Sequence, residues 1–551
     1  MKELLIDALF LKGNLKHIEK IRKFLVLLKI LNVQTETVAL CSENKEFQVY
    51  FQFACLLRGT NYVIINSREI DSYMLSVLGV KLLLFDESSR LHKLPSLDYL
   101  FDITHVDILV NVCTLKIESV NSNLENHGQI RIEYNLRLLS ELAYKFIPNE
   151  VNLDLKELKK AFSNAYSILY RESTVYVIHP GNSSYGEKTS VYTSEILLKG
   201  VLKALNALQA EKYNLDNLNS FTYGNIALPY VFLLGVVIPF IHEREFYFKK
   251  PGLDNFKTKS YVDIIDYVLI SANSLTFLLL DIIDETDCFS FTKDKIFISL
   301  RNMLFSRFIF RRKFKFQNPM PIFVIYGNID ERLRKFLKIL KIRVLYIYTM
   351  IEVASFISYK YYPKITSKAL TVGKLPKKAV LNGKDLEGNA ELLIDLEDQF
   401  ITYTNTEFTQ LCSMSEKYMG MHSTLDICSE NKEGEVTIIG KAEELFRNQN
   451  GLLVQNSLIY SIVLNNSYVE DALIVVLDNH VVVIVELRVS VLLLNKKTPI
   501  AVIRELNRTL IKEINKKVKP FSKVHRICLI PAGFATGNDS KIKLSNYLQH
   551  N

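Results

Sequence analysis

The fold of this chain is decided by the stretch Val175-Tyr176-Val177-Ile178-His179-Pro180-Gly181-Asn182-Ser183-Ser184-Tyr185-Gly186-Glu187-Lys188. Its first four residues form an apolar run that predicts a buried strand. The rest mixes glycines with small hydroxyl and amide side chains and ends in a lysine. Such a loop can direct backbone N–H groups and one cation toward a polyphosphate. The same composition is typical of an ordinary turn, so the loop alone leaves both interpretations open.

The chain is long enough for several domains. Its 551 residues are 48% hydrophobic, which predicts a large core and about three or four domain-sized units. The net charge of +9, from 68 basic and 59 acidic residues, is too small an excess over this length to indicate a nucleic-acid partner. Seven scattered cysteines without metal-ligand spacing predict reduced thiols and a cytoplasmic protein.

We expect neither a signal peptide nor a transmembrane segment. Residues 1–7 carry acids within their first apolar stretch, which does not fit a secretory leader. The longest apolar run near the middle, residues 229–241, is too short to span a bilayer and fits a core element better.

The order of patterns predicts a mixed α/β fold. Apolar residues at helical spacing and short apolar runs alternate along the chain, which is typical of βαβ units and a largely parallel sheet. The expected helices are residues 17–31, 47–57, 155–160, 195–208 and 331–340, and the expected strands are residues 38–40, 62–65, 80–85, 175–178, 321–327 and 344–348.

The pattern changes near residue 440. A strand and turn at residues 435–441 precede paired strands at 472–477 and 480–487 and a basic amphipathic helix at 500–517. We therefore expect two domains. They are a large N-terminal domain of several subdomains with mostly parallel sheets, residues 1–439, and a small mobile α+β domain, residues 440–551.

Four features follow one another along the chain. They are the opening loop, a Tyr-x-x-x-Glu segment, a late aspartate and a lysine near the C-terminus. This set resembles the adenylate-forming (AMP-binding) superfamily of acyl-CoA synthetases, fatty-acyl-AMP ligases, adenylation domains and luciferases, over residues 18–548. The resemblance implies ATP-dependent activation of a small-molecule carboxylic acid to acyl-AMP. A thiol of CoA or of a phosphopantetheine carrier then takes the acyl group.

The opening loop resembles the family's phosphate-binding loop, TSGTTGxPKG. Gly181 falls on the first glycine, and Asn182 and Ser183 fall on the two hydroxyl positions. Ser184 replaces the second glycine, and Lys188 reaches the lysine position with one inserted residue. Backbone N–H groups and hydroxyls can still face phosphate oxygens. The lost glycine restricts how closely the backbone approaches them.

Residues 348–352 match the family's Y-G-x-T-E motif. The match implies that Tyr348 stacks on adenine and that Glu352 holds Mg²⁺ against the ATP phosphates. Thr349 stands where the family has a glycine of the nucleotide site. Upstream, Gly327 falls on the adenine-side glycine.

Three more polar residues follow from the resemblance. Asp426, in Thr424-Leu425-Asp426, matches T-G-D and would accept both ribose hydroxyls. Lys441 replaces an arginine of the nucleotide site, which keeps the charge and loses the bidentate fork. Lys541 lands on the catalytic lysine of P-x-T-x-S-G-K-I, which contacts the carboxylate and the α-phosphate.

Residues 227–235 resemble the segment beside the acyl pocket, with Phe232 at its gate position and Gly235 at its end. The segment holds no acid, so the ammonium of an amino-acid substrate would stay unpaired at high cost. This favours a fatty or other apolar acid, and hence a role in fatty acid metabolism, over amino-acid adenylation.

Two alternatives stay open. One is a catalytically degenerate homologue that binds a nucleotide or a partner, because glycines, a hydroxyl and an arginine of the motifs are replaced. The other is amino-acid adenylation. The basic stretches at residues 307–316 and 516–519 most simply turn cations to solvent. They also leave open contact with an acyl carrier protein or peripheral contact with a membrane.

Overall fold

The computed structural model describes most of the chain. The described residues are 1–32, 36–65, 75–76, 78–86, 106–121, 123–124, 126–143, 155–166, 168, 173–178, 188–210, 219–248, 266–272, 274–275, 321–325, 329, 333–334, 337–338, 341–351, 353, 356–365, 370–385, 388–395, 402–405, 411–413, 421–441, 454, 456–464, 466, 468–477, 480–518 and 520–529.

The N-terminal part is built on a nine-stranded sheet in the order β17-β16-β7-β6-β2-β1-β3-β4-β5. Its strands are β1 (Thr37–Cys41), β2 (Asn61–Ile65), β3 (Val80–Phe85), β4 (Ile108–Asn111), β5 (Lys116–Val120), β6 (Thr174–Ile178), β7 (Lys188–Thr193), β16 (Thr402–Asn405) and β17 (Leu411–Ser413). The central strands β6, β2, β1, β3 and β4 run parallel, and the strands toward both edges are antiparallel.

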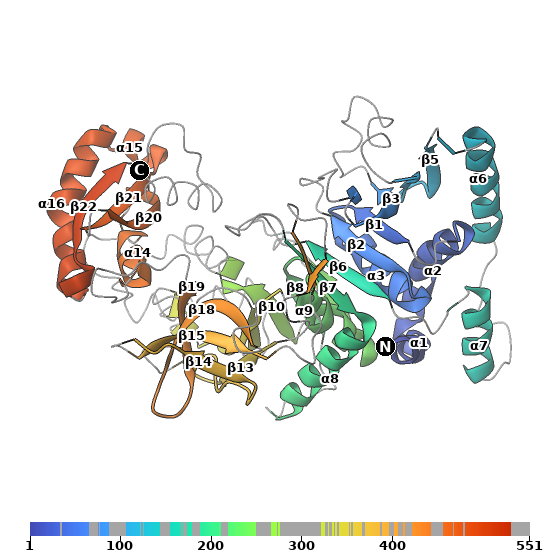
Figure 1. The fold of residues 1–551 in the computed structure, drawn as a ribbon, viewed down its shortest axis with the longest axis horizontal. Helices are drawn as coiled ribbons and strands as arrows, with labels where there is room; N and C mark the ends of the chain where they lie inside the picture. Colours follow the sequence, from blue (N-terminus) through green and yellow to red (C-terminus); the bar gives the residue numbers. More distant parts are fainter. Residues whose placement is uncertain are drawn as a thin grey trace.

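Helices pack against this sheet and along its edge (Figure 1). They are α1 (Lys2–Leu9), α2 (Leu15–Ile30), α3 (Lys45–Arg58), α6 (His127–Ala143), α7 (Leu155–Ala165) and α8 (Ser194–Ala210), with a 3₁₀ turn η1 (Lys12–Asn14). Helix α3 begins where the Asn44 side chain accepts from the N–H groups of Glu46 and Phe47. It ends at Gly59, whose φ of 76° is the left-handed conformation that glycine adopts without strain.

A second sheet of six strands has the order β13-β12-β11-β10-β8-β9. Its strands are β8 (Ser220–Tyr223), β9 (Phe246–Phe248), β10 (Tyr267–Ser271), β11 (Pro321–Ile325), β12 (Arg343–Tyr348) and β13 (Ser358–Tyr362). Only β13 runs antiparallel to its neighbour. The six-stranded sheet is therefore mostly parallel and the nine-stranded sheet is parallel at its centre, and the expected mixed α/β fold is confirmed.

The apolar run at residues 229–241 is a buried helical segment, as expected. It consists of α9 (Pro229–Phe232), a π-helical turn η3 (Leu233–Val237) and α10 (Ile238–Ile241). Two carbonyls of the π turn accept side-chain hydroxyls: Tyr267 donates to the Leu234 carbonyl and Ser220 to the Gly235 carbonyl. Strands β8 and β10 thus satisfy backbone groups of the irregular turn that would otherwise be buried without partners.

Two smaller sheets complete the fold. The four-stranded antiparallel sheet has the order β14-β15-β18-β19, with β14 (Ala379–Asn382), β15 (Asn389–Ile394), β18 (His422–Glu430) and β19 (Val436–Lys441). The three-stranded sheet contains β20 (Val469–Leu477), β21 (His480–Leu487) and β22 (Val524–Leu529). It packs with α14 (Asn456–Leu464), α15 (Val489–Leu494) and α16 (Pro499–Lys517), followed by the 3₁₀ turn η7 (Pro520–Ser522).

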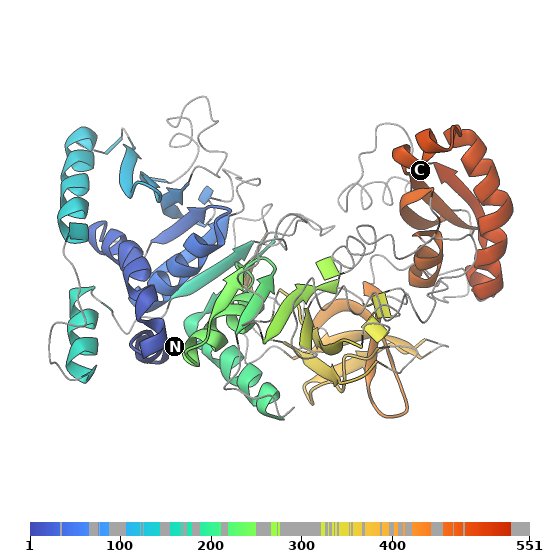
Figure 2. The same cartoon turned by 180° about the vertical axis from the view of Figure 1, so that it is seen from behind.

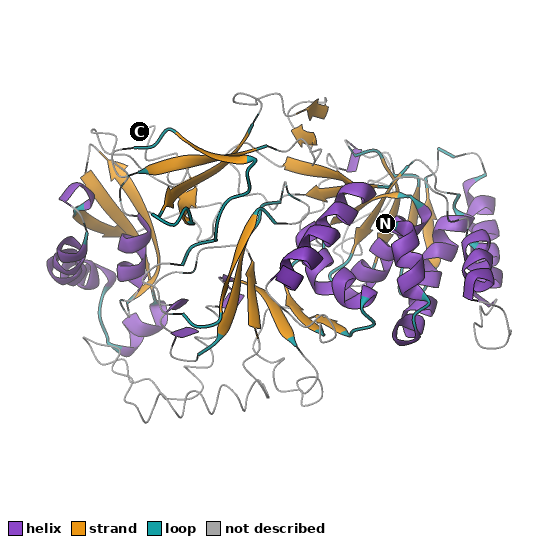
Figure 3. Cartoon of the chain, turned by 90° about the horizontal axis from the view of Figure 1, so that it is seen from below, coloured by secondary structure: helices purple, strands orange, loops and turns teal. Residues whose placement is uncertain are grey.

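The buried apolar side chains divide between these parts. One large cluster joins α1–α3 and the nine-stranded sheet to the π-helical segment. A second cluster lies between the six-stranded and four-stranded sheets. A third contains only residues between 454 and 527. This C-terminal α+β unit lies at one end of the molecule in Figures 1 and 2, and its three strands form a sheet of their own. Figure 3 shows the fold from below, with helices in purple and strands in orange.

Candidate nucleotide site

Tyr348 and Asp426, 78 positions apart in the sequence, meet in a buried hydrogen bond. The Tyr348 hydroxyl donates to Oδ2 of Asp426. Tyr348 is the last residue of β12 in the six-stranded sheet, and Asp426 lies in β18 of the four-stranded sheet. Their side chains are 8% and 5% exposed. Two of the residues chosen from the sequence are therefore brought together across the junction of two sheets.

The backbone around Asp426 is held by Thr424. The Thr424 hydroxyl donates to the Leu392 carbonyl at 2.9 Å and accepts from the Asp426 N–H at 3.1 Å. Between them, Leu425 has a φ of 56°, in the left-handed region that favours glycine. This is the position where the T-G-D motif has its glycine. The turn that aims Asp426 keeps the shape that the motif predicts, even though leucine replaces the glycine.

Burial, together with the charge and the hydrogen bond of Asp426, raises the pKa of Tyr348 well above its ordinary value. A hydroxyl beside a carboxylate resists ionisation because a second negative charge would be unfavourable there. Tyr348 is therefore a neutral hydrogen-bond donor throughout the physiological pH range. Asp426, in turn, is positioned to accept from hydroxyl groups.

Strand β19 places Lys441 opposite Asp426. The two residues are cross-strand partners in the antiparallel β18–β19 pair, next to a register shift between Ile427 and Cys428. Cross-strand neighbours have Cβ atoms about 5 Å apart. The backbone therefore brings the expected lysine and aspartate of the nucleotide site to one position on the sheet.

Thr349 follows Tyr348 and is also buried. Its hydroxyl donates to the Met350 carbonyl at 3.4 Å. The residue that replaces the family glycine is thus accommodated by a local hydrogen bond to the backbone.

Phe232 and Gly235 lie in the helical segment at residues 229–241. Phe232 is 1% exposed and packs against Phe53 of α3, with ring centroids 5.5 Å apart. Gly235 faces β8: a Cβ atom at this position would lie 2.3 Å from Oγ1 of Thr222. A glycine is therefore required where the π turn approaches the strand.

The remaining site residues are placed only in part. Lys188 begins β7, which pairs antiparallel with β6, so the phosphate-loop candidate connects two neighbouring strands. The side chains of Lys188 and Lys441 lie outside the described residues, as do Gly181, Asn182, Ser183, Ser184, Gly327, Glu352 and Lys541.

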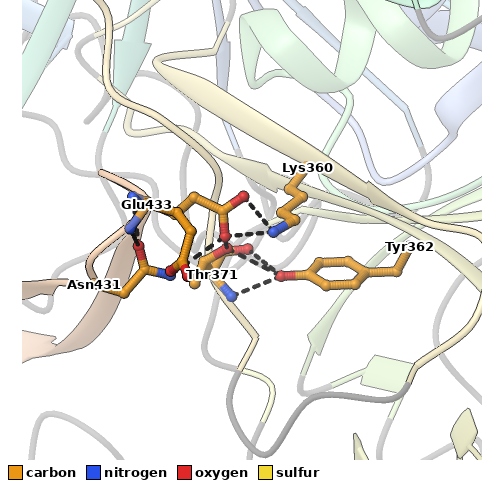
Figure 4. Close-up of polar contacts among 6 residues, drawn as sticks. Lys360, Tyr362, Thr371, Asn431 and Glu433 are labelled. Atoms are coloured by element: carbon orange, nitrogen blue, oxygen red, sulfur yellow. Dashed lines mark hydrogen bonds and ion pairs between the residues drawn. The ribbon is translucent and has the colours of Figure 1, made fainter.

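A polar cluster that no sequence motif predicts links the same two sheets (Figure 4). Lys360 of β13 forms an ion pair with Glu435, which also accepts from the Thr371 hydroxyl at 3.0 Å. The Tyr362 hydroxyl accepts from the Thr371 N–H at 2.7 Å, and Asn431 Oδ1 accepts from the Glu435 N–H at 2.9 Å. No spacing in the sequence links these positions, because the packing of one sheet against the other brings them together.

The hydrogen bond from Lys360 lowers the pKa of Glu435 below its ordinary value of 4.5. Thr371 and Asn431 act in the same direction, and burial opposes them. Glu435 is therefore charged at neutral pH, and the cluster anchors the turn between β18 and β19. Asp426 lies on β18, so the cluster stabilises the element that carries it.

Within the described part of the chain, no group of three or more His, Cys, Asp or Glu side chains could hold a metal ion. In that same part, no helix has both the length and the apolar character needed to cross a membrane.

Comparison of the sequence with protein-family models finds no match, and comparison with curated proteins finds none either. The fold, in contrast, is similar to solved ligases over nearly its whole length. It matches the anthranilate CoA ligase AuaEII in complex with anthranoyl-AMP with a TM-score of 0.64 and 12% identity, covering 99% of this chain and 96% of that chain.

Two further structures agree. O-succinylbenzoate coenzyme A synthetase from Bacillus subtilis, in complex with ATP and magnesium, has a TM-score of 0.65 at 12% identity, covering 99% of each chain. The ATP-bound RpMatB-BxBclM chimera has a TM-score of 0.62 at 12% identity, covering 100% of this chain and 99% of that chain. The chain therefore has the fold of these ligases over nearly its whole length.

Proposed function

We propose that this protein activates a carboxylic acid with ATP, forming acyl-AMP and pyrophosphate, and then transfers the acyl group to a thiol. The observation that carries the proposal is the meeting of Tyr348 with Asp426. Both residues were chosen from sequence motifs 78 positions apart, and the fold places them at one point. The likeness to ligases that bind ATP or an acyl-adenylate supports the same reaction.

Asp426 fits the proposed role of ribose ligand. Its buried carboxylate already accepts a hydroxyl hydrogen bond, from Tyr348, which is the kind of contact that a ribose hydroxyl makes. In the nucleotide complex, the ribose would take the place of the Tyr348 hydroxyl, and the tyrosine ring would turn its face to adenine. Lys441, opposite Asp426 on β19, would add a positive charge beside the nucleotide.

The roles of the remaining site residues are proposed from the sequence motifs alone. Gly181, Asn182, Ser183, Ser184 and Lys188 would hold the ATP phosphates, and Gly327 and Thr349 would border the nucleotide. Glu352 would supply a carboxylate to Mg²⁺, an ion that commonly binds proteins through one or two carboxylates plus substrate phosphates. Lys541 would neutralise charge as the acid's carboxylate attacks the α-phosphorus.

We also propose that residues 1–439 and 440–551 act as two domains. The separate apolar cluster between residues 454 and 527 supports an independent C-terminal unit. Rotation of this unit would bring Lys541 to the nucleotide for the first step and withdraw it for the second. The acceptor thiol would come from CoA or from the phosphopantetheine of a carrier protein.

For the substrate, we propose a fatty or other apolar acid. The helical segment at residues 229–241 contains no acidic side chain and packs in the apolar core, which disfavours a substrate with an ammonium group. The similar ligases are named for anthranilate and O-succinylbenzoate, which supports testing aryl acids as well.

The reaction is tested by exchange of labelled pyrophosphate into ATP over a panel of fatty, aryl and amino acids. We expect exchange with at least one apolar acid and none with amino acids. Exchange with amino acids alone would refute the substrate class and leave the reaction standing. Binding of ATP without exchange for any acid would favour the alternative of a degenerate, nucleotide-binding homologue.

A further inference from the structure

The C-terminal unit carries three exposed aliphatic side chains on the successive helices α15 and α16. We define the apolar corner as Val489, Leu493 and Ile500, whose side chains are 66%, 73% and 63% exposed. Val489 and Leu493 are one helical turn apart on α15, and Ile500 lies in the first turn of α16. Large apolar side chains that are exposed on two successive helices suit a contact surface.

A basic face continues from this corner along α16. Ile500, Arg504, Arg508 and Lys512 are spaced four residues apart, so they follow one side of the helix. We define the basic face as Arg504, Arg508 and Lys512, together with Lys496 in the turn between the helices. Figures 1 and 2 show α16 on the side of the C-terminal unit that is turned away from the four-stranded sheet.

Among the described residues, the cations of the basic face have no acidic partner. Glu505 and Glu513, the two acids of α16, are paired with Lys497 and Lys517 at 2.5 and 2.7 Å. Among the described residues, no ion pair involves Lys496, Arg504, Arg508 or Lys512. Residues 440–551 hold fifteen Lys and Arg against nine Asp and Glu, which accounts for most of the net charge of +9. We therefore expect the partner of the basic face to be anionic.

We propose that this corner binds the surface of an anionic phospholipid bilayer. Lys and Arg beside exposed aliphatic side chains suit such a surface, because the cations meet headgroup phosphates while the aliphatic groups enter the acyl boundary. Leu493 and Val489 would insert, and Arg504, Arg508 and Lys496 would contact headgroups. An acidic carrier protein would satisfy the charges but offers no apolar phase for three aliphatic side chains.

The test is co-sedimentation of the full chain with vesicles of phosphatidylcholine, with or without phosphatidylglycerol. We expect binding only to the anionic vesicles, with loss on raising the salt from about 0.1 M to about 0.5 M. The apolar variant Val489→Ser, Leu493→Ser, Ile500→Ser should weaken binding about tenfold or more. The basic variant Arg504→Gln, Arg508→Gln should do the same.

Helix α6 provides a matched control. Ile132, Leu136 and Leu139 are 63%, 62% and 57% exposed along one face of α6, in the N-terminal part of the chain. The triple serine variant at these positions should bind vesicles like the wild type. Circular dichroism and urea unfolding of each variant would verify that the fold is intact.

Absence of binding to anionic vesicles at low salt would overturn the proposal. So would equal binding to pure phosphatidylcholine, or loss of binding in the α6 variant while both corner variants bind normally. If the corner variants lost only association with an acidic carrier protein or with a second copy, and vesicles did not bind, the membrane assignment would likewise be wrong.

Discussion

At the scale of single residues, the contact between Tyr348 and Asp426 is the main structural support for the proposed nucleotide site. The two motifs could be chosen from the sequence because an aromatic residue and a carboxylate suit adenine and ribose. Their hydrogen bond to each other could not be predicted, since it depends on how two sheets meet. The same holds for the left-handed φ of Leu425, a conformation that leucine rarely adopts.

We expect Asp426→Ala to weaken ATP binding about tenfold or more, as loss of a hydrogen bond to a charged group does. It should also lower the free energy of unfolding by about 1–3 kcal/mol, because the Tyr348 hydroxyl stays buried without its acceptor. Titration calorimetry with ATP and urea unfolding would measure the two effects.

Tyr348→Phe is the matched control for that change. It keeps the ring and frees the Asp426 carboxylate, so ATP affinity should be equal to or higher than that of the wild type. If Tyr348→Phe weakened ATP binding as much as Asp426→Ala, the tyrosine hydroxyl itself would be the ligand and our placement of the ribose would be wrong.

At the scale of elements, most strands and helices followed from the sequence. The expected strands at 38–40, 62–65, 80–85 and 344–348 correspond to β1, β2, β3 and β12, and the expected helix at 500–517 corresponds to α16. The expected helix at 155–160 corresponds to part of α7, whereas no element was predicted for β4, β5 and α6; β4 and β5 are only four and five residues long. The π turn at Leu233–Val237 leaves the apolar pattern of a helix unchanged, so nothing in the pattern predicts it.

The close approach of the π turn to β8 gives a prediction about Gly235. Gly235→Ala would place its Cβ 2.3 Å from Oγ1 of Thr222, so we expect a loss of about 1–3 kcal/mol in unfolding free energy. In the double variant, Thr222→Ala should recover most of the lost stability, because the colliding hydroxyl is removed. Urea unfolding of the four proteins forms a double-mutant cycle.

Gly128→Ala, in α6, is the control glycine. Nothing lies within 4 Å of a Cβ at that position, so stability should be unchanged or slightly higher. A Gly235→Ala variant as stable as the wild type, or one that Thr222→Ala does not rescue, would show that the π turn can shift away from the strand.

The cluster around Glu435 gives a prediction about pH. A carboxyl whose pKa is lowered by folding stabilises the native state above its unfolded pKa, and this contribution is lost as the pH falls through the folded value. Glu435→Gln should therefore be less stable than the wild type at pH 7, by about 1 kcal/mol or less because Lys360 and Glu435 are partly exposed to water.

The difference in unfolding free energy between the wild type and Glu435→Gln should narrow below about pH 4.5, where the free carboxyl is protonated. Urea unfolding between pH 7 and pH 4 would measure it. Glu433→Gln, on the same turn, is the control, because Glu433 contributes only its backbone N–H to the cluster. If this difference in unfolding free energy stayed constant with pH, the contact between Glu435 and Lys360 would not act as an ion pair.

At the scale of the whole molecule, the fold class was predictable and the completed site was not. Alternation of helices and strands predicted mostly parallel sheets, and the change of pattern near residue 440 predicted a separate C-terminal domain. The structure confirms the mixed α/β class and shows that the apolar cluster of the C-terminal unit contains only its own residues. The residues of the phosphate loop, Glu352 and Lys541 stay predictions from the sequence, because they lie outside the described residues.

The most direct test of the central claim is acid-dependent exchange of pyrophosphate into ATP by the wild type and by Lys541→Ala. We expect exchange by the wild type with an apolar acid and a loss of about a hundredfold or more in the variant, because a charge that stabilises the transition state is removed. Exchange that survives Lys541→Ala unchanged would show that another group stabilises the transition state. No exchange with any acid, together with no measurable ATP binding, would contradict the enzyme assignment itself.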